Sequence, residues 1–328
     1  MNMPLRRRSL LGLAVLASVI ATPPGALAQG DTWPSRPIRL MVTSAAGGQT
    51  DQIARILAQQ LQASLGQPVV VEAQGGANGM LATGTVAKAS PDGYTLLMTH
   101  GALVQNEALR PQKPYAFSEL APLAMVATLP IGFAINTSSG ASSLADWVRR
   151  AKAEPQRYSY ASYGQGSSGH VMGEILKRAA GLDIPHIAYR GGAPAAADLV
   201  AGHVSASFGA LSDLSPHVPT GRVKIVAVTG AARNPRFPDV PTFAEQGYPA
   251  VNLGAFTGVL APAGLPRPIA SRLTQEVQRI VRGPELSAKL NDIGYTPAPL
   301  NAEEFDAFLR ADIERWREAV KANQIKID

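Results

Sequence analysis

The stretch of sequence at residues 37–65 reads PIRLMVT, SAAGGQT and DQIARILAQQLQASL. Its first part is a short apolar run rich in strand-forming residues, and it is followed by small turn-forming residues. In the third part apolar residues recur every three or four positions, which places them on one face of a helix that Gly66 ends. A buried strand, a tight turn and an amphipathic helix in succession are typical of an α/β fold.

The same alternation continues along the chain. Strands are predicted at residues 68–71, 94–99, 158–162, 186–189, 204–208 and 224–229. Helices are predicted at residues 143–154, 168–180, 195–201, 268–282, 284–293 and 302–322. Because strands that alternate with helices form parallel sheets covered on both faces, we expect two lobes, each a mostly parallel sheet flanked by helices.

Two long strand-like stretches, residues 123–136 and 251–261, separate these groups of elements. They predict two strands that cross between the lobes, and hence a hinged pair with a cleft. Lobe 1 would comprise residues 29–129 plus 252–328, and lobe 2 residues 130–251.

The first 28 residues have the pattern of a signal peptide. Three arginines at positions 6–8 precede an apolar stretch at residues 10–21, which is too short to span a bilayer as a helix. Ala26 and Ala28 then provide a small-x-small cleavage pattern, so we expect export to the periplasm and cleavage near Ala28. The Arg7-Arg8 pair leaves open whether export follows the general or the twin-arginine route.

Composition excludes several classes of function. The chain has 328 residues and a net charge of +6, which falls to 27 − 24 = +3 without the three N-terminal arginines. With no long basic run, a nucleic-acid partner is not expected. The absence of cysteine excludes disulfides, cysteine-ligated metals and a thiol nucleophile. The histidines are scattered without metal-ligand spacing, so neither a metal nor a cofactor is expected.

The turn after the first strand indicates an anion site. Ala46, Gly47 and Gly48 would let the backbone approach a ligand closely, and free N–H groups at a helix start favour a negative charge. Asp51, in the first helical turn, could hold the loop by accepting hydrogen bonds from the N–H groups of the loop. An ordinary tight turn with a capping aspartate is the alternative.

A second glycine-rich turn occupies residues 162–170, SYGQGSSGH, between a strand and a helix. Residues 164–169 fit the dinucleotide pattern G-x-G-x-x-G, but no acidic residue follows the next strand to hold a ribose. The same backbone donors, with the hydroxyls of Ser167 and Ser168, suit a smaller anion better. A hydrolase is a further alternative, although neither serine lies in G-x-S-x-G and His170 near a serine is not a triad. His100, directly after a strand, and His170 are the better candidates among the histidines.

Over nearly all of the predicted mature chain the sequence resembles the Bug-type solute receptors of tripartite tricarboxylate transporters. The resemblance is carried, in order, by WPSRPIR (33–39), GGQTD (47–51), LGQPVVVE (65–72), AKASPDGYTLL (87–97), YAS (160–162), HIAYRG (186–191), PDVPT (238–242) and LAPAG (260–264). Each motif is weak alone, whereas their order and spacing together are specific.

The resemblance implies a type II-like, two-lobe periplasmic binding protein, not an enzyme. It would close around a small carboxylate and deliver it to the membrane subunits of the transporter, and we expect it to act as a monomer. A periplasmic sensor protein of the same fold is the alternative. The implied ligand-binding residues are those of the two glycine-rich turns and the strand ends beside them: Ala46, Gly47, Gly48, Asp51, His100, Ser162, Gly166, Ser167, Ser168, His170, Tyr189 and Gly209.

Three departures from the family pattern bear on the ligand. Ala46 stands where the family usually has proline, and Gln74-Gly75-Gly76-Ala77-Asn78-Gly79 replaces Arg-Pro-Gly-Ala-Gly-Gly. Gly209 stands where the family usually has aspartate, so nothing at that position could pair with a ligand ammonium. The sequence therefore favours a carboxylate with an uncharged body over an amino acid.

Overall fold

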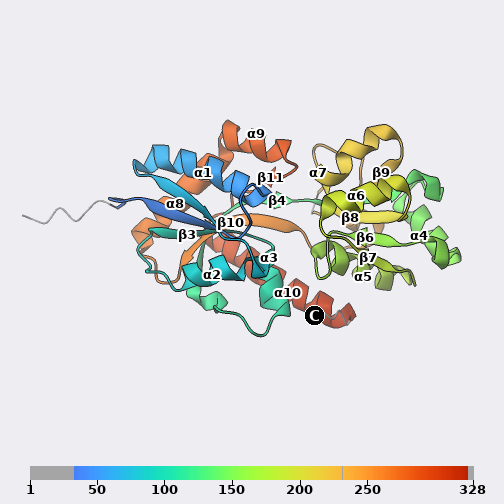
Figure 1. Cartoon of the computed structure of the whole chain (residues 1–328), viewed down its shortest axis with the longest axis horizontal. Helices are drawn as coiled ribbons and strands as arrows, with labels where there is room; N and C mark the ends of the chain where they lie inside the picture. Colours follow the sequence, from blue (N-terminus) through green and yellow to red (C-terminus); the bar gives the residue numbers. More distant parts are fainter. Residues whose placement is uncertain (1–32, 231, 324–328) are drawn as a thin grey trace, which may run out of the picture. The chain divides into compact units, whose positions relative to one another are not determined.

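Two β-sheets organise the described part of the chain, residues 33–230 and 232–323 of a computed structural model (Figure 1). The predicted signal peptide lies outside the described residues. Among the helices that are described, none has both the length and the apolarity needed to cross a membrane.

The first sheet has the strand order β11-β4-β10-β3-β1-β2. Its strands are β1 (Ile38–Val42), β2 (Val69–Ala73), β3 (Thr95–His100), β4 (Leu120–Leu129), β10 (Ala255–Pro262) and β11 (Thr296–Pro297). The helices packed around it are α1 (Gln49–Leu65), α2 (Met80–Ala87), α3 (Ala102–Leu109), α8 (Arg267–Arg282), α9 (Pro284–Asp292) and α10 (Ala302–Asn323). In Figure 1, α1 and α9 lie on one side of this sheet, whereas α2, α3 and α10 lie on the other.

The second sheet has the strand order β7-β6-β8-β5-β9. Its strands are β5 (Ile131–Asn136), β6 (Tyr160–Ser162), β7 (His186–Ala188), β8 (Ala206–Ala210) and β9 (Val223–Val228). Its helices are α4 (Leu144–Ala153), α5 (Ser168–Ala180), α6 (Gly192–Ala201) and α7 (Leu211–Leu214). The core of this half contains tilted and edge-on aromatic pairs, among them Phe133 with Phe208 at 4.7 Å and with Trp147 at 5.1 Å between ring centroids.

The α/β class is confirmed, but the expectation of mostly parallel sheets needs correction. Pairs β1–β2, β1–β3, β6–β7 and β6–β8 are parallel, as strands joined through helices should be. The pairs that involve β4, β5 and β10 are antiparallel, so both sheets are mixed. The long strands enter between strands that are remote in sequence, and local periodicity does not encode that choice of partner.

One predicted crossing strand is present and the other is shorter than expected. Strand β4 continues into β5 through Pro130, so the chain passes directly from the first sheet to the second. The return connection runs from the end of β9 to Ala255, where β10 begins, and its last residues, 251–254, have no regular secondary structure. Helix α10 also contacts elements of both halves, since it packs against α3 and α5.

Candidate functional site

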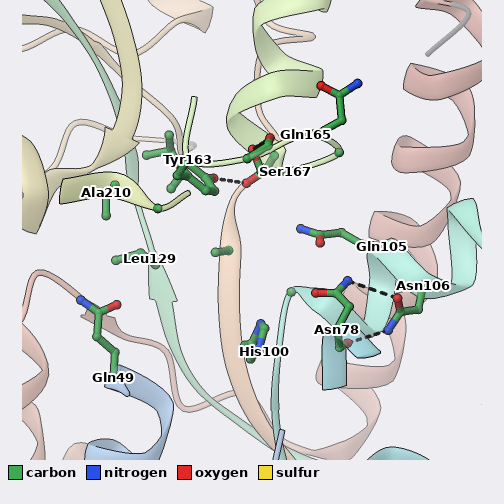
Figure 2. Close-up of a pocket in the computed structure, with 18 of the residues that line it drawn as sticks. Gln49, Asn78, His100, Gln105, Asn106, Leu129, Tyr163, Gln165, Ser167 and Ala210 are labelled. Carbon is green, nitrogen blue, oxygen red and sulfur yellow. Dashed lines mark hydrogen bonds between the residues drawn. The ribbon is translucent and has the colours of Figure 1, made fainter. Parts of the chain in front are cut away.

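A cavity of about 570 Å³ opens between residues of the two sheets. Its lining comes from the start of α1, the end of β3, α3, the β4–β5 junction, the loop between β6 and α5, the start of α6, and α7. Most of these segments follow the carboxyl ends of strands, which is where open α/β sheets bind ligands. The volume is in the usual range for a small-molecule site. In Figure 2, Gln49 of α1 and Ser167 before α5 lie on opposite sides of this cavity.

The start of α1 is held by a buried carboxylate. Asp51 Oδ2 accepts the Gly47 N–H at 2.8 Å and Arg55 Nε at 2.9 Å, and the Asp51 side chain is 1% exposed. Burial raises the pKa of Asp51, but the hydrogen bonds from Arg55 and Gly47 and the charge of Arg55 outweigh burial, so the pKa is lowered overall. Asp51 is therefore ionised at neutral pH and fixes the loop that precedes the helix.

The glycine amides in the loop before α1 are hydrogen-bonded, whereas two amides in the first turn of the helix are not. Gly47 donates to Asp51, and the Gly48 N–H donates to the Ala45 carbonyl at 3.1 Å. Within the described residues no acceptor is recorded for the N–H groups of Gln49 and Thr50, which lie in the first turn where helices leave their amides unpaired. The donors available to a ligand therefore belong to the helix itself rather than to the glycines before it.

The start of α5 is built in a similar way. Ser167 is the N-cap, and its Oγ accepts the His170 N–H at 3.3 Å and donates to the Gly164 carbonyl at 2.7 Å. The Gly166 N–H donates to His170 Nδ1 at 3.0 Å. Within the described residues the Ser168 N–H has no hydrogen-bond acceptor, so this amide at the N-terminus of α5 is available to a ligand.

Ser168 also presents a hydroxyl to the cavity. Its Oγ is hydrogen-bonded to the Tyr163 hydroxyl, which in turn accepts the Gly169 N–H at 3.2 Å. Either hydroxyl can donate in this pair, because the Tyr163 oxygen keeps a second lone pair. In the arrangement in which Tyr163 donates, Ser168 keeps its own hydroxyl hydrogen as a donor beside its free amide.

A stacked histidine pair lies behind this second loop. The rings of His170 and His186 are 4.2 Å apart and nearly parallel, and Ser162 Oγ lies 2.8 Å from His186 Nε2. Burial lowers the pKa of His170, and burial together with the His170 charge lowers the pKa of His186 to about 4. Both rings are thus uncharged at neutral pH. They fix the loop through the hydrogen bonds of His170 with Gly166 and of His186 with Ser162.

Comparison with known proteins shows to which family this chain is related. Residues 53–325 match the family model described as "Tripartite tricarboxylate transporter family receptor". The chain belongs to this receptor family. It is 33% identical to Protein BugT of Bordetella pertussis, over 100% of both chains. It is also 33% identical to a protein of the tcbD-tcbE intergenic region of a Pseudomonas species, over 96% of this chain and 94% of the relative.

Solved structures of family receptors share the fold of this family member. MatC of Rhodopseudomonas palustris, solved with bound malate, is 30% identical with a TM-score of 0.69, over 88% of this chain and 100% of that one. Rpa4515 of R. palustris, solved with adipate, is 30% identical with a TM-score of 0.75, over 89% and 99%. A TctC solute binding protein from Polaromonas is 25% identical with a TM-score of 0.80, over 89% and 100%. These relatives are binding receptors, not enzymes, so the hydrolytic and nucleotide-binding alternatives lose their support.

The structure places only some of the predicted ligand-binding residues of this family member on the cavity. His100, Gly166, Ser167 and Ser168 line it. The remaining predicted residues do not line it, and they are Ala46, Gly47, Gly48, Asp51, Ser162, His170, Tyr189 and Gly209. Several of them stabilise the loops that lead to the cavity instead. Asp51 holds the loop before α1, and His170 holds the loop before α5. The Tyr189 hydroxyl donates to Asp198 at 2.6 Å, away from the lining.

His100 is a neutral donor at the end of β3. Its Nδ1 accepts the Ala102 N–H at 3.3 Å, which leaves the ring proton on Nε2. Burial lowers the pKa of His100, so the ring stays uncharged at neutral pH. His100 can therefore donate a hydrogen bond into the cavity without adding a charge.

Sequence reasoning missed much of the polar lining. Asn78 and Asn106 form a reciprocal pair, in which Asn78 Nδ2 donates to Asn106 Oδ1 at 3.2 Å and Asn106 Nδ2 donates to the Asn78 carbonyl at 2.9 Å (Figure 2). Gln49, Gln105 and Gln165 add further amides, and Arg110 and Asp213 add charges. All of these residues except Arg110 lie in the loop or helix that follows the carboxyl end of a strand, and this was the available signal, since ligands gather at that edge of a sheet.

The role of Asp51 gives a prediction for the stability of this family member. Asp51→Asn should lower the free energy of unfolding by about 1–2 kcal/mol at pH 7, since hydrogen bonds to an ionised group are stronger than neutral ones. The folded-state pKa is lowered, so the stabilisation is present above the unfolded pKa of about 3.9 and is lost as the pH falls through the folded pKa. Urea unfolding at pH 7 and at pH 3 would measure it, with exposed Asp183→Asn as control. An equal loss at both pH values would contradict the assignment.

Proposed function

We propose that this chain is an extracytoplasmic solute receptor that captures a small carboxylate between its two sheets by hinge closure. It would then deliver the ligand to the membrane subunits of a tripartite tricarboxylate-type transporter. The observation that carries the proposal is the pair of helix starts, α1 and α5, which border one cavity and where, within the described residues, the Gln49, Thr50 and Ser168 amides have no internal acceptor.

The electrostatics favour an anion at this place. A helix N-terminus carries roughly half a positive charge, and its unpaired amides point along the axis toward a ligand. Desolvating a carboxylate costs several kcal/mol, so several convergent donors are needed to replace its water. The Gln49 and Ser168 amides, the Ser168 hydroxyl and His100 supply such donors around the cavity.

The connections between the sheets suit a hinge. Leu129 and Ile131 flank Pro130 at the passage from β4 to β5, and both line the cavity. A rotation there would change the distance between the two helix starts directly. We therefore keep the proposed lobes, residues 29–129 plus 252–328 and residues 130–251, as the bodies that move. A ligand that contacts both helix starts binds the closed form better and shifts the population toward it.

Three further observations support the transport role. The description of the family names a tripartite tricarboxylate transporter. Two family receptors were solved with a bound carboxylate, one with malate and one with adipate. BugD, another relative of solved structure, is described as a periplasmic binding protein, which agrees with the signal peptide proposed for residues 1–28.

A thermal-shift screen tests the proposal. Aliphatic and aromatic mono-, di- and tricarboxylates are added to the purified mature chain, with the corresponding primary amides as uncharged controls. A true ligand at about 100 times its Kd adds about 2.7 kcal/mol to the stability of the native state, and therefore raises the Tm by several degrees. Stabilisation by amides as strong as by the acids would contradict recognition of a carboxylate.

A further inference from the structure

Asp213 brings a carboxylate into the cavity. It lies in α7, directly after β8, and its side chain lines the cavity. Its Oδ2 is seated over the backbone of Gly192, where a Cβ would lie only 1.9 Å from that oxygen. The absence of a side chain at Gly192 therefore makes room for this carboxylate.

Within the described residues, the carboxylate of Asp213 has no cationic partner. None of the ion pairs and hydrogen bonds recorded over residues 33–230 and 232–323 involves the Asp213 side chain. The side chain is partly buried, and burial raises the pKa of its carboxyl group. A partly buried carboxylate without a partner is less favourable than a paired one, and a cationic group on a ligand in the cavity would supply the missing partner.

The neighbours of Asp213 are also suited to a cation. Burial is the main reason why the pKa of Tyr163 is raised to about 12 and that of Tyr295 is also raised, and the charge of Asp213 adds to both. Tyr163 lines the cavity together with Asp213, whereas Tyr295 does not line it. A carboxylate and an aromatic side chain that line the same cavity are groups that can together receive an ammonium group.

Arg110 is the positively charged side chain that lines the same cavity, and it favours a different ligand. It follows α3 and is exposed, so solvent and salt screen its charge more strongly than that of partly buried Asp213. A dicarboxylate could use Arg110, but it would bring a second negative charge into a cavity that already contains Asp213. Because the less screened charge has the larger effect, selectivity is expected to follow Asp213.

We propose that Asp213 is a specificity-determining residue, which selects carboxylates that also carry an ammonium group and disfavours dicarboxylates. The inference rests on the proposed function, since the helix starts hold the carboxylate end. It reverses the expectation drawn from Gly209: that position does not line the cavity, whereas the aspartate four residues later does.

Matched ligands and one nearly isosteric variant test this assignment. Isothermal titration calorimetry is performed with the straight-chain acids from propionate to hexanoate, their α- and ω-amino derivatives, and the matching diacids. With the wild-type chain, the best amino acid should bind at least about tenfold more tightly than the unsubstituted acid and the diacid of the same length. Asp213→Asn should remove at least about tenfold of that preference and improve diacid binding. Exposed Asp183→Asn is the matched control and should change neither.

The outcomes separate this inference from the proposed function. If unsubstituted acids or diacids bind more tightly than every amino acid, and Asp213→Asn leaves that order unchanged, the role of Asp213 is wrong while carboxylate capture stands. If no acid of any series binds to the wild-type chain or to the variant, carboxylate capture is wrong and the inference falls with it. Circular dichroism of each variant shows whether a lost affinity reflects lost folding.

Discussion

Replacing Ser167 with aspartate is expected to reduce carboxylate affinity by at least about a hundredfold. Ser167 is the N-cap of α5 and lines the cavity beside the Ser168 amide. An aspartate there would place a fixed negative charge where the ligand carboxylate must bind, and like charges in such contact cost several kcal/mol. About 2.7 kcal/mol already corresponds to a hundredfold loss. Calorimetry with a carboxylate identified by thermal shift would measure the effect.

Ser167→Asn is the matched control for charge. Asparagine and aspartate are both good N-cap residues and have nearly the same shape, so either can accept the His170 N–H in place of the serine hydroxyl. The asparagine variant should therefore retain affinity within a few-fold, and the two variants should have similar Tm values. An equal loss of affinity in both variants would mean that the shape of the loop, not anion binding, explains the effect.

Replacing Gly173 with alanine is expected to cause the largest loss of stability. Gly173 lies in α5 against the ring of Tyr160, where an added Cβ would lie 1.9 Å from Cε2 and 2.2 Å from Cζ. The ring has no free space, because Tyr160 is 1% exposed and its hydroxyl donates to Glu174 at 2.7 Å. Overpacking a core usually costs about 1–3 kcal/mol, and this overlap with a fixed ring should reach the upper end of that range.

Gly254→Ala is the matched substitution for that experiment. A Cβ at Gly254 meets no atom within 4 Å, so the variant should unfold at nearly the same urea concentration as the wild-type chain. Comparing the two variants by urea unfolding separates overlap with Tyr160 from a general effect of alanine for glycine. A Gly173→Ala variant as stable as Gly254→Ala would show that α5 can move away from the Tyr160 ring.

The elements with strong local signals could be predicted from the sequence. Helix α1 ends at Leu65 with Gly66 as its C-cap, and Ser143 caps α4 through the Asp146 N–H, both as predicted. These features depend on residues close together in the chain. Helix α3, which has a weak amphipathic pattern and lines the cavity, was not predicted at all. The antiparallel partners of β4 and β10 were also missed, because they lie far away in sequence.

The site was predicted at the level of its elements but not of its atoms. The two glycine-rich turns do lead into helices that border one cavity. The glycine amides expected to hold the ligand are, however, engaged with Asp51, Ala45 and His170. Such pairing depends on the fold of each loop, which spacing alone does not reveal. Asp213 was missed because nothing local distinguishes an aspartate in a short polar turn from one that faces a cavity.

The central claim is that the first turns of α1 and α5 hold the ligand carboxylate together. The most direct measurement is a crystal structure of the mature chain with a carboxylate selected by thermal shift. The account predicts carboxylate oxygens within hydrogen-bond distance of the Gln49 or Thr50 amide on one side and of the Ser168 amide on the other, directly or through one ordered water at about 2.9 Å from each partner. A carboxylate bound elsewhere, with both helix starts facing bulk solvent, would contradict it.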